Sequence, residues 1–171
     1  MRLNVPYVSQ LGDGATLPDD CGQASTLTLL LHYRRVTARV AVDMLSRDTY
    51  GKTTAPQLVS LASRYDLPMA YDTAQNPDRG LLAAFEAGHP VILLVNYADL
   101  GFPVHLVGGV NQGLHWLVGT GQDEDGNWIV NDPLWVGSQG AGLTLSPARL
   151  KAAYRRYRVF HQDAKPLLAG A

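Results

Sequence analysis

The sequence of 171 residues predicts an α+β protein, with helices in its N-terminal half and an antiparallel β-sheet in its C-terminal half. Apolar residues recur at helical spacing through residues 20–88. From Pro90 onward the apolar runs are short, as in strands. Asp125-Gly126 lies between two of these runs and is a pair typical of β-hairpin turns. Helices followed by antiparallel strands are the pattern of the α+β class.

The N-terminal segment predicts a short strand, a loop and the first helix. Residues 5–8 form a predicted edge strand, because Pro6 lacks the N–H that a central strand needs. Residues 12–18 have the composition of a loop. Asp20 can cap the helix that follows, with Gln23 as its capping-box partner. The inward face of this helix is formed by Ala24, Leu27, Leu30 and Leu31.

Three further helices are predicted before Pro90. The first follows Thr37. The second begins with Thr54 as its N-cap, because Pro56 suits the first turn and Gln57 can complete a capping box. The third runs from about Pro77 to Gly88, a helix-stop residue. The buried positions at helical spacing are Val40, Met44 and Leu45 in the first, and Leu58, Leu61, Ala62 and Tyr65 in the second.

The C-terminal half predicts the sheet and one more helix. The predicted strands are residues 91–97, 104–107, 114–120, 128–130 and 158–162. Ser146 and Pro147 mark the start of a helix that extends to about Tyr157. Residues 163–171 are predicted to be a flexible tail, so the predicted single domain spans residues 1–162.

Composition narrows the classes of function. The net charge is −1, which argues against nucleic acid or an anionic membrane as the main partner. No apolar run approaches the ~20 residues of a membrane span, and residues 1–10 lack a signal-peptide core. The single cysteine excludes an internal disulfide; it favours the cytoplasm but leaves the compartment open. We predict no metal and no cofactor, because the motifs for zinc, dinucleotides and phosphates are missing. The oligomeric state stays open.

Cys21 is the first candidate for chemistry. It lies in the first turn of the predicted helix, where free N–H groups and the positive end of the helix dipole favour a thiolate. Asp20 opposes this, because a neighbouring carboxylate disfavours a second anion. A lone cysteine is more often a small buried apolar residue, so a base within reach is required before it is a nucleophile.

His115 is the candidate base. Of the five histidines, His32 lies about three turns along the first helix, His89 lies at a helix-to-strand turn, and His161 lies in the predicted last strand or the tail. His105 and His115 remain, both in the strand-rich half. His115 opens one strand of the predicted hairpin and Asp132 follows the other. The two are therefore expected to be neighbours, with Asp132 fixing the tautomer of the imidazole.

These segments resemble the papain-like peptidases related to the enzymes that process bacteriocin leaders after a double glycine. The resemblance covers about residues 3–160 and rests on short motifs in matching order: Val5–Gln10, Asp20–Ser25, Gly88–Ile92, His115-Trp116 and Asn131–Pro133. It implies a papain-like fold with Cys21 on the first helix as nucleophile. It also implies that His115 is the general base and acid and that Asp132 orients it.

The oxyanion-hole glutamine of that family matches Gln10. In the family this glutamine stands only a few residues before the cysteine, whereas ten residues separate Gln10 from Cys21 here. Residues 11–20 must therefore loop out for Gln10 to reach the site. The resemblance implies hydrolysis of a peptide or amide bond in a peptide or protein substrate, through a thioester on Cys21.

Three alternatives remain at this point. A transglutaminase-like acyl transferase uses the same Cys–His–Asp order with an amine in place of water. A non-catalytic peptide-binding domain would keep the fold without the chemistry. A thiol regulated by oxidation needs only a reactive Cys21 and does not need Asp132.

Weaker signals have simpler interpretations. The segment that begins with Asp123–Asn127 lacks the glycine at the sixth position and the glutamate at the twelfth position of a calcium loop, so it is predicted to be a hairpin turn. The tryptophans near the hairpin are expected to pack in the core more than to line a groove: Trp116, Trp128 and Trp135. A basic cluster is expected to be a solvated end of the last helix: Arg149, Lys151, Arg155, Arg156 and Arg158.

Overall fold

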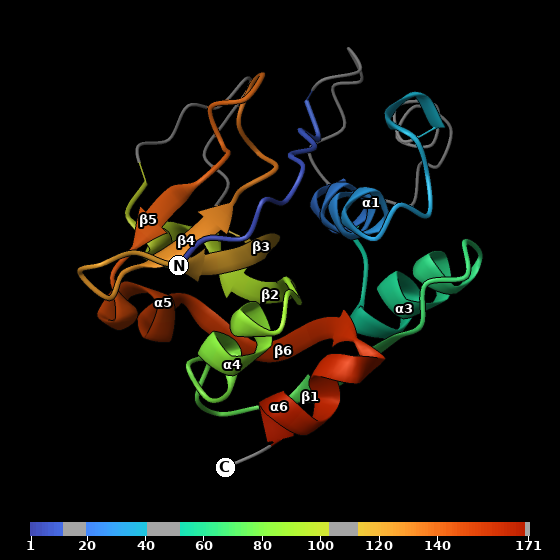
Figure 1. The fold of residues 1–171 in the computed structure, drawn as a ribbon. Coiled ribbons are helices and arrows are strands. Elements are labelled where there is room, and N and C mark those ends of the chain that lie inside the picture. Colours follow the sequence, from blue (N-terminus) through green and yellow to red (C-terminus); the bar gives the residue numbers. More distant parts are fainter. Residues whose placement is uncertain (12–19, 41–51, 103–112, 170–171) are drawn as a thin grey trace.

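A computed structural model describes residues 1–11, 20–40, 52–102 and 113–169, and in this part of the chain six strands form one sheet (Figure 1). The strand order is β1-β6-β2-β3-β4-β5, and all neighbours are antiparallel. The strands are β1 (Met69–Thr73), β2 (Val91–Asn96), β3 (Leu114–Gln122), β4 (Trp128–Asn131), β5 (Leu143–Leu145) and β6 (Tyr154–His161). The last strand in the chain thus lies between β1 and β2.

Helices cover both faces of the sheet, as Figure 1 shows. On one face lie α1 (Cys21–His32) and α3 (Ala55–Ser63). On the other face lie α4 (Leu81–Glu86), α5 (Pro147–Ala153) and α6 (Lys165–Ala169). The 3₁₀ helices are η1 (Tyr97–Leu100) and η2 (Gln162–Ala164). This mixed architecture, with Cys21 on the first helix, confirms the predicted papain-like α+β fold class.

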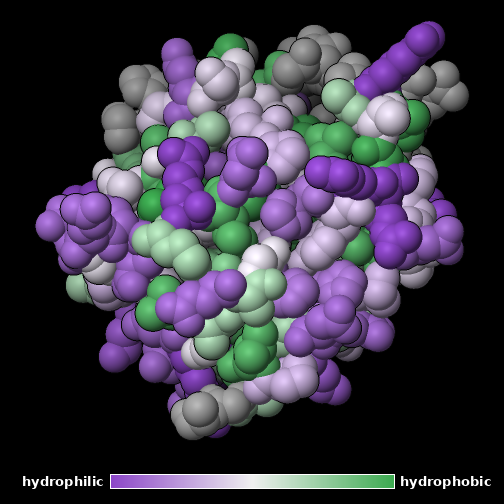
Figure 2. Space-filling view, viewed as in Figure 1, coloured by the Kyte–Doolittle hydropathy of each residue, from purple (hydrophilic) through white to green (hydrophobic). Residues whose placement is uncertain are grey.

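Two hydrophobic cores follow from this layering. Alternate residues of β2 enter different cores: Ile92 packs with the α1 and α3 side chains, and Leu93 packs with those of α4 and α5. Burial from both faces explains why β2 is an unbroken apolar run, since neither face meets water. Figure 2 shows hydrophilic residues over most of one face of the molecule, with small groups of hydrophobic residues between them.

The predicted N-terminal cap of α3 is confirmed, whereas that of α1 is not. Thr54 and Gln57 form the predicted capping box of α3. Asp20 is the N-cap of α1, but its side chain makes no capping hydrogen bond, so that prediction was wrong. The helix predicted after Thr37 falls mainly on residues 41–51, and the strand at residues 104–107 also lies outside the described residues.

Two strands were missed and one helix boundary was wrong, around residue 70 and in the C-terminal half. β1 and β5 were missed, because both are short and only partly buried. The last long helix ends at Ala153, and β6 begins at once with Tyr154. Pairing with both β1 and β2 draws residues 154–157 into the sheet instead of a helix.

Residues 5–8 do not form the predicted edge strand. Side-chain hydroxyls hold this segment instead. Tyr7 donates to the backbone oxygens of Asp132 and Trp135, both at 2.9 Å, and Ser9 donates to the Trp135 oxygen at 2.7 Å. The N-terminal segment is therefore fastened to the chain that follows β4.

The C-terminal segment is ordered through residue 169, whereas the sequence predicts a flexible tail from residue 163. Residues 162–169 form η2 and α6. Leu168 is buried among the side chains of the second core, and α6 packs on α4. Burial of this apolar residue stabilises a helix too short to persist by itself.

Arg158 lies in the interior and not on a solvated helix end. Its side chain donates to both carboxylate oxygens of Asp72, at 2.9 and 2.6 Å, and to the backbone oxygen of Arg79 at 2.7 Å. Arg158 is 1% exposed. Its fork of donors joins β6 to β1 and to the segment that leads into α4.

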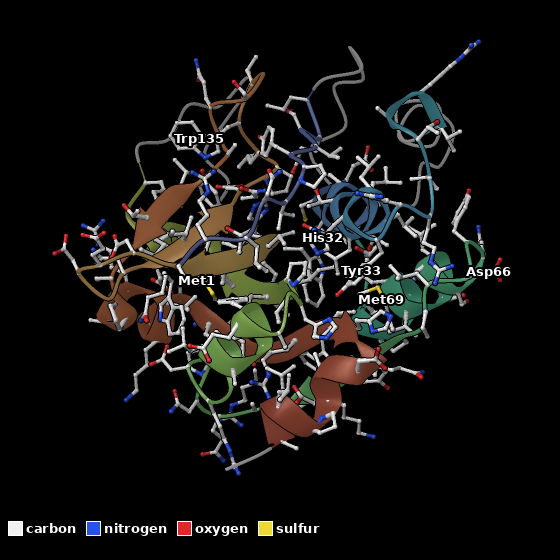
Figure 3. The ribbon with its side chains drawn as sticks, viewed as in Figure 1. Met1, His32, Tyr33, Asp66, Met69 and Trp135 are labelled. Atoms are coloured by element: carbon white, nitrogen blue, oxygen red, sulfur yellow. The ribbon has the colours of Figure 1, made fainter. Side chains whose placement is uncertain are left out.

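Histidines and a tyrosine fasten the end of α1 to the sheet. The rings of His89 and His161 stack with centroids 5.5 Å apart, and Tyr33 stacks on His161 at 4.8 Å. The Tyr33 hydroxyl donates to Nδ1 of His89 at 2.9 Å, and His32 Nε2 donates to the Gly88 oxygen at 3.0 Å. Figure 3 shows His32 and Tyr33 at the C-terminal end of α1, beside the sheet.

This cluster predicts a loss of stability in acid. Burial lowers the pKa of His89, and the charge of His161 lowers it further, although Asp163 opposes this. The unfolded chain therefore binds the proton first, and the free energy of unfolding decreases as the pH falls below about 6.5. Replacing His89 with Phe keeps the ring and removes the titration. Urea unfolding at pH 7.5 and 5.0 should show a smaller decrease for H89F than for the unmodified protein, and equal decreases would contradict the prediction.

Candidate active site

Cys21 is the first residue of α1 and is 8% exposed. The free N–H groups of the first turn surround it with positive partial charge. Gly22 allows this turn to pack closely on the chain before α3. A Cβ at Gly22 would lie 1.9 Å from Thr53 Oγ1 and 2.9 Å from a Leu58 methyl carbon. Any side chain at position 22 would therefore force the first turn of α1 and its neighbours Thr53 and Leu58 apart.

His115 and Asp132 come together at one end of the β3–β4 hairpin. His115 is the second residue of β3, and Asp132 directly follows β4. Nε2 of His115 lies 2.7 Å from Oδ1 of Asp132, and both residues are 0% exposed. The sequence predicts the two residues as neighbours on this hairpin, and in the structure they form a buried hydrogen-bonded pair.

The electrostatics of His115 connect it to both other candidates. Burial lowers its pKa, but the charges of Asp132 and Cys21, and hydrogen bonding to both, raise the pKa to about 10. Nδ1, the ring nitrogen that does not face Asp132, is buried. Because Asp132 occupies Nε2, Nδ1 is the nitrogen left for proton exchange with the thiol. The arrangement can hold a thiolate and an imidazolium side by side.

Gln10 is buried beside the same segment, at 1% exposure. Its backbone N–H donates to the Pro133 oxygen at 2.9 Å, so it lies next to the residue that follows Asp132. The ten residues between Gln10 and Cys21 therefore do not remove Gln10 from this part of the molecule.

The other histidines lie elsewhere or cannot be placed. The stacked cluster contains His89 and His161, with His32 beside it, at the far end of α1 from Cys21. His105 lies outside the described residues. Within the ranges that the structure describes, no group of three or more His, Cys, Asp or Glu side chains is arranged to hold a metal ion. None of the described helices has the length and apolar character needed to cross a membrane.

Sequence reasoning missed the aromatic residues around Asp132. The indole N–H of Trp135 donates to Oδ2 of Asp132 at 3.0 Å. The Tyr97 ring lies edge-on to His115, with centroids 5.2 Å apart and planes at 90°. The Tyr97 contact had no sequence signal, because η1 and β3 meet only in the folded chain. Trp135, three residues after Asp132, was placed near the hairpin but was expected to pack in the core.

The pattern of the Peptidase_C39 like family matches residues 2–163, nearly the whole chain. This chain belongs to that family. Its function is therefore of the peptidase type. A search of curated proteins finds no match to the chain.

Solved structures share the fold of this Peptidase_C39 like protein. A putative C39-like peptidase from Bacillus anthracis has a TM-score of 0.63 at 14% identity, covering 95% of this chain and 98% of that one. A double glycine motif protease from an AMS/PCAT transporter was solved in complex with the leader peptide. It has a TM-score of 0.61 at 16% identity, covering 94% of this chain and 93% of that one. The peptidase domain of Streptococcus ComA, a bi-functional ABC transporter involved in quorum sensing, has a TM-score of 0.61 at 19% identity, covering 92% of this chain and 98% of that one.

A groove of about 810 Å³ opens beside Cys21 in this Peptidase_C39 like protein. Its lining comes from the first turns of α1 and α3 and from the strands β1, β2, β3 and β6. Three exposed apolar side chains line it, Tyr71, Leu114 and Tyr157. The remaining lining residues are Lys52, Thr53, Thr54, Ala55, Pro56, Leu94, Gly113 and Trp116. Trp116 thus both packs in the core and faces the groove, with its N–H donating to the Thr53 oxygen at 2.9 Å.

Proposed function

We propose that this chain is a cysteine peptidase or amidase, with Cys21 as nucleophile, His115 as general acid and base, and Asp132 as the group that orients His115. The observation that carries the proposal is the buried contact of His115 Nε2 with Asp132 Oδ1 at 2.7 Å, in a site where Cys21 also raises the His115 pKa. A buried ion pair contributes little to stability, so its presence beside a thiol favours a chemical role.

The reaction follows from the positions of these groups. The Cys21 thiolate attacks the carbonyl carbon, and the backbone N–H of Cys21 and the side-chain amide of Gln10 stabilise the oxyanion. His115 gives its Nδ1 proton to the leaving amine as the C–N bond breaks, which leaves a thioester on Cys21. His115 then removes a proton from water, and the hydroxide attacks the thioester carbonyl. The C–S bond breaks, which releases the carboxylic acid and restores the thiolate and imidazolium.

The groove supports a peptide as substrate. It reaches Cys21, and Tyr71, Leu114 and Tyr157 offer apolar contact to the side chains of a bound peptide. The fold is also that of a double glycine motif protease that was solved with a leader peptide bound.

Alkylation of Cys21 tests the proposal without a known substrate. With His115 as its partner, Cys21 should react with iodoacetamide at a rate that reaches a plateau well below pH 8.5, the ordinary pKa of a thiol. The plateau should extend toward pH 10, where His115 loses its proton. Intact mass between pH 4 and 10 gives the rates, and the single cysteine makes the adduct unambiguous. In His115→Ala the reactivity should move to near pH 8.5.

His105→Ala is the matched control and should leave the profile unchanged. If His105→Ala, and not His115→Ala, removes the low-pH reactivity, the base has been assigned wrongly. Titration of the unmodified protein near pH 8.5 would refute the ion pair. Cleavage in ¹⁸O-labelled water with an added amine separates the reaction types, because hydrolysis places ¹⁸O in the new carboxylate and acyl transfer forms a new amide.

A further inference from the structure

The two carboxylate oxygens of Asp132 have different donors. Oδ1 accepts from His115 Nε2 at 2.7 Å and from the backbone N–H of Leu134 at 3.0 Å. Oδ2 accepts from the indole N–H of Trp135 at 3.0 Å. Donors on both oxygens hold the rotation of the carboxylate about Cβ–Cγ more firmly than donors on Oδ1 alone would.

Trp135 is itself held in place. Its ring meets Phe102 edge to face, with centroids 6.1 Å apart. Its backbone oxygen accepts from the hydroxyls of Tyr7 at 2.9 Å and Ser9 at 2.7 Å. Figure 3 shows Trp135 near β4 and β5, in the segment that follows β4. An indole N–H only donates, so its hydrogen bond to Oδ2 uses the carboxylate as an acceptor.

The fit around Gly140 supports the same geometry. A Cβ there would lie 2.0 Å from the backbone oxygen of Asp132 and 3.0 Å from Cβ of Trp135. The Gly140 oxygen also accepts from the Asp132 backbone N–H at 2.8 Å. The chain from Asp132 to Gly140 therefore folds back tightly on itself and brings the indole over the carboxylate.

We propose that Trp135 is a positioning residue: its indole N–H fixes the Asp132 carboxylate so that Oδ1 stays aimed at His115 and the imidazole keeps Nδ1 toward Cys21. Tyr97, edge-on to His115, also limits the movement of the imidazole ring. This inference rests on the proposed function, because it assigns Trp135 a role through His115 in the same reaction.

The test compares iodoacetamide alkylation at pH 6 in the unmodified protein and in two variants. Trp135→Phe keeps an aromatic ring and removes the N–H. Replacement of Trp135 by benzothienylalanine keeps the shape of the indole and substitutes sulfur for the N–H. Each should lower the alkylation rate about 10-fold to 100-fold, because a small misplacement of a reacting group has effects of this size. The far-downfield proton resonance of His115 Nε2–H should shift or broaden in both.

Phe102→Leu is the control, because it removes the ring partner of Trp135 and leaves the indole N–H in place. It should alter the rate by less than either Trp135 variant. If the benzothienylalanine protein keeps the alkylation profile and the His115 resonance of the unmodified protein, the positioning role is refuted. If the unmodified protein shows no low-pH reactivity dependent on His115, the proposed function fails instead, so the two failures are distinguishable.

Discussion

Replacing Cys21 by alanine is expected to abolish peptide hydrolysis and to leave the fold intact. The thiol is the only group in the proposed mechanism that forms a covalent bond to the substrate. Loss of a nucleophile from such a site lowers kcat by about 10⁶-fold. The cost in stability is expected to be small, about 1 kcal/mol or 2–4 °C in Tm, because one sulfur atom leaves the edge of the core.

The measurement is a digest of a peptide library, with new termini identified by mass spectrometry. Cleavage sites produced by the unmodified protein should be missing from the Cys21→Ala digest, while circular dichroism and Tm show that the variant is folded. The same cleavage sites at the same rates in both proteins would exclude Cys21 as the nucleophile. Cleavage by neither protein, with tight peptide binding by both, would identify a binding domain instead.

Replacing Arg158 by methionine is expected to lower the free energy of unfolding by about 3 kcal/mol. Breaking a buried ion pair by removal of one partner costs about 3–5 kcal/mol, because the other charge stays without compensation. The lower end applies here, since the Asp72 side chain is 32% exposed and water reaches it. The variant also loses the hydrogen bond to the Arg79 oxygen. Urea unfolding at pH 7 measures the change.

The same strand provides a matched control. Arg155 pairs with Asp99, and both side chains are more than a third exposed. Arg155→Met should therefore cost less than about 1 kcal/mol, the usual limit for a surface pair. The double variant Asp72→Asn, Arg158→Met should be less destabilised than the sum of its single changes. Equal losses for Arg155→Met and Arg158→Met would show that burial of the second pair is energetically unimportant.

Local signals predicted the elements whose chemistry is contained in a few residues. The capping box at Thr54 and Gln57 and the buried run of β2 are such cases. Asp20 has the right residue type for capping but does not bond the helix with its side chain. A strand was predicted at residues 158–162, but the start of β6 at Tyr154 and its place between β1 and β2 could not be inferred, because this pairing is decided by tertiary contacts.

The neighbouring positions of His115 and Asp132 could also be predicted from a short stretch of sequence. His115 and Asp132 lie on one hairpin, so their spacing along the chain already placed them together. Trp135 was expected to be a core residue, because its contact with Asp132 depends on how the segment after β4 folds back, and sequence periodicity does not report that. Arg158 was placed in a solvated cluster, because nothing near it in the sequence marks Asp72 as its partner.

The place of β6 between β1 and β2 has a consequence for how the protein is made. A ribosome releases Cys21 early, His115 and Asp132 much later, and the strand that joins β1 to β2 last of these. A growing chain that ends before Tyr154 can pair β2 with β3, β4 and β5 but leaves β1 outside the sheet, because β6 supplies the hydrogen bonds to both β1 and β2. We therefore expect the six-stranded sheet to form only after residues 154–161 have left the ribosome, so that β1 joins the sheet late although it is made before β2.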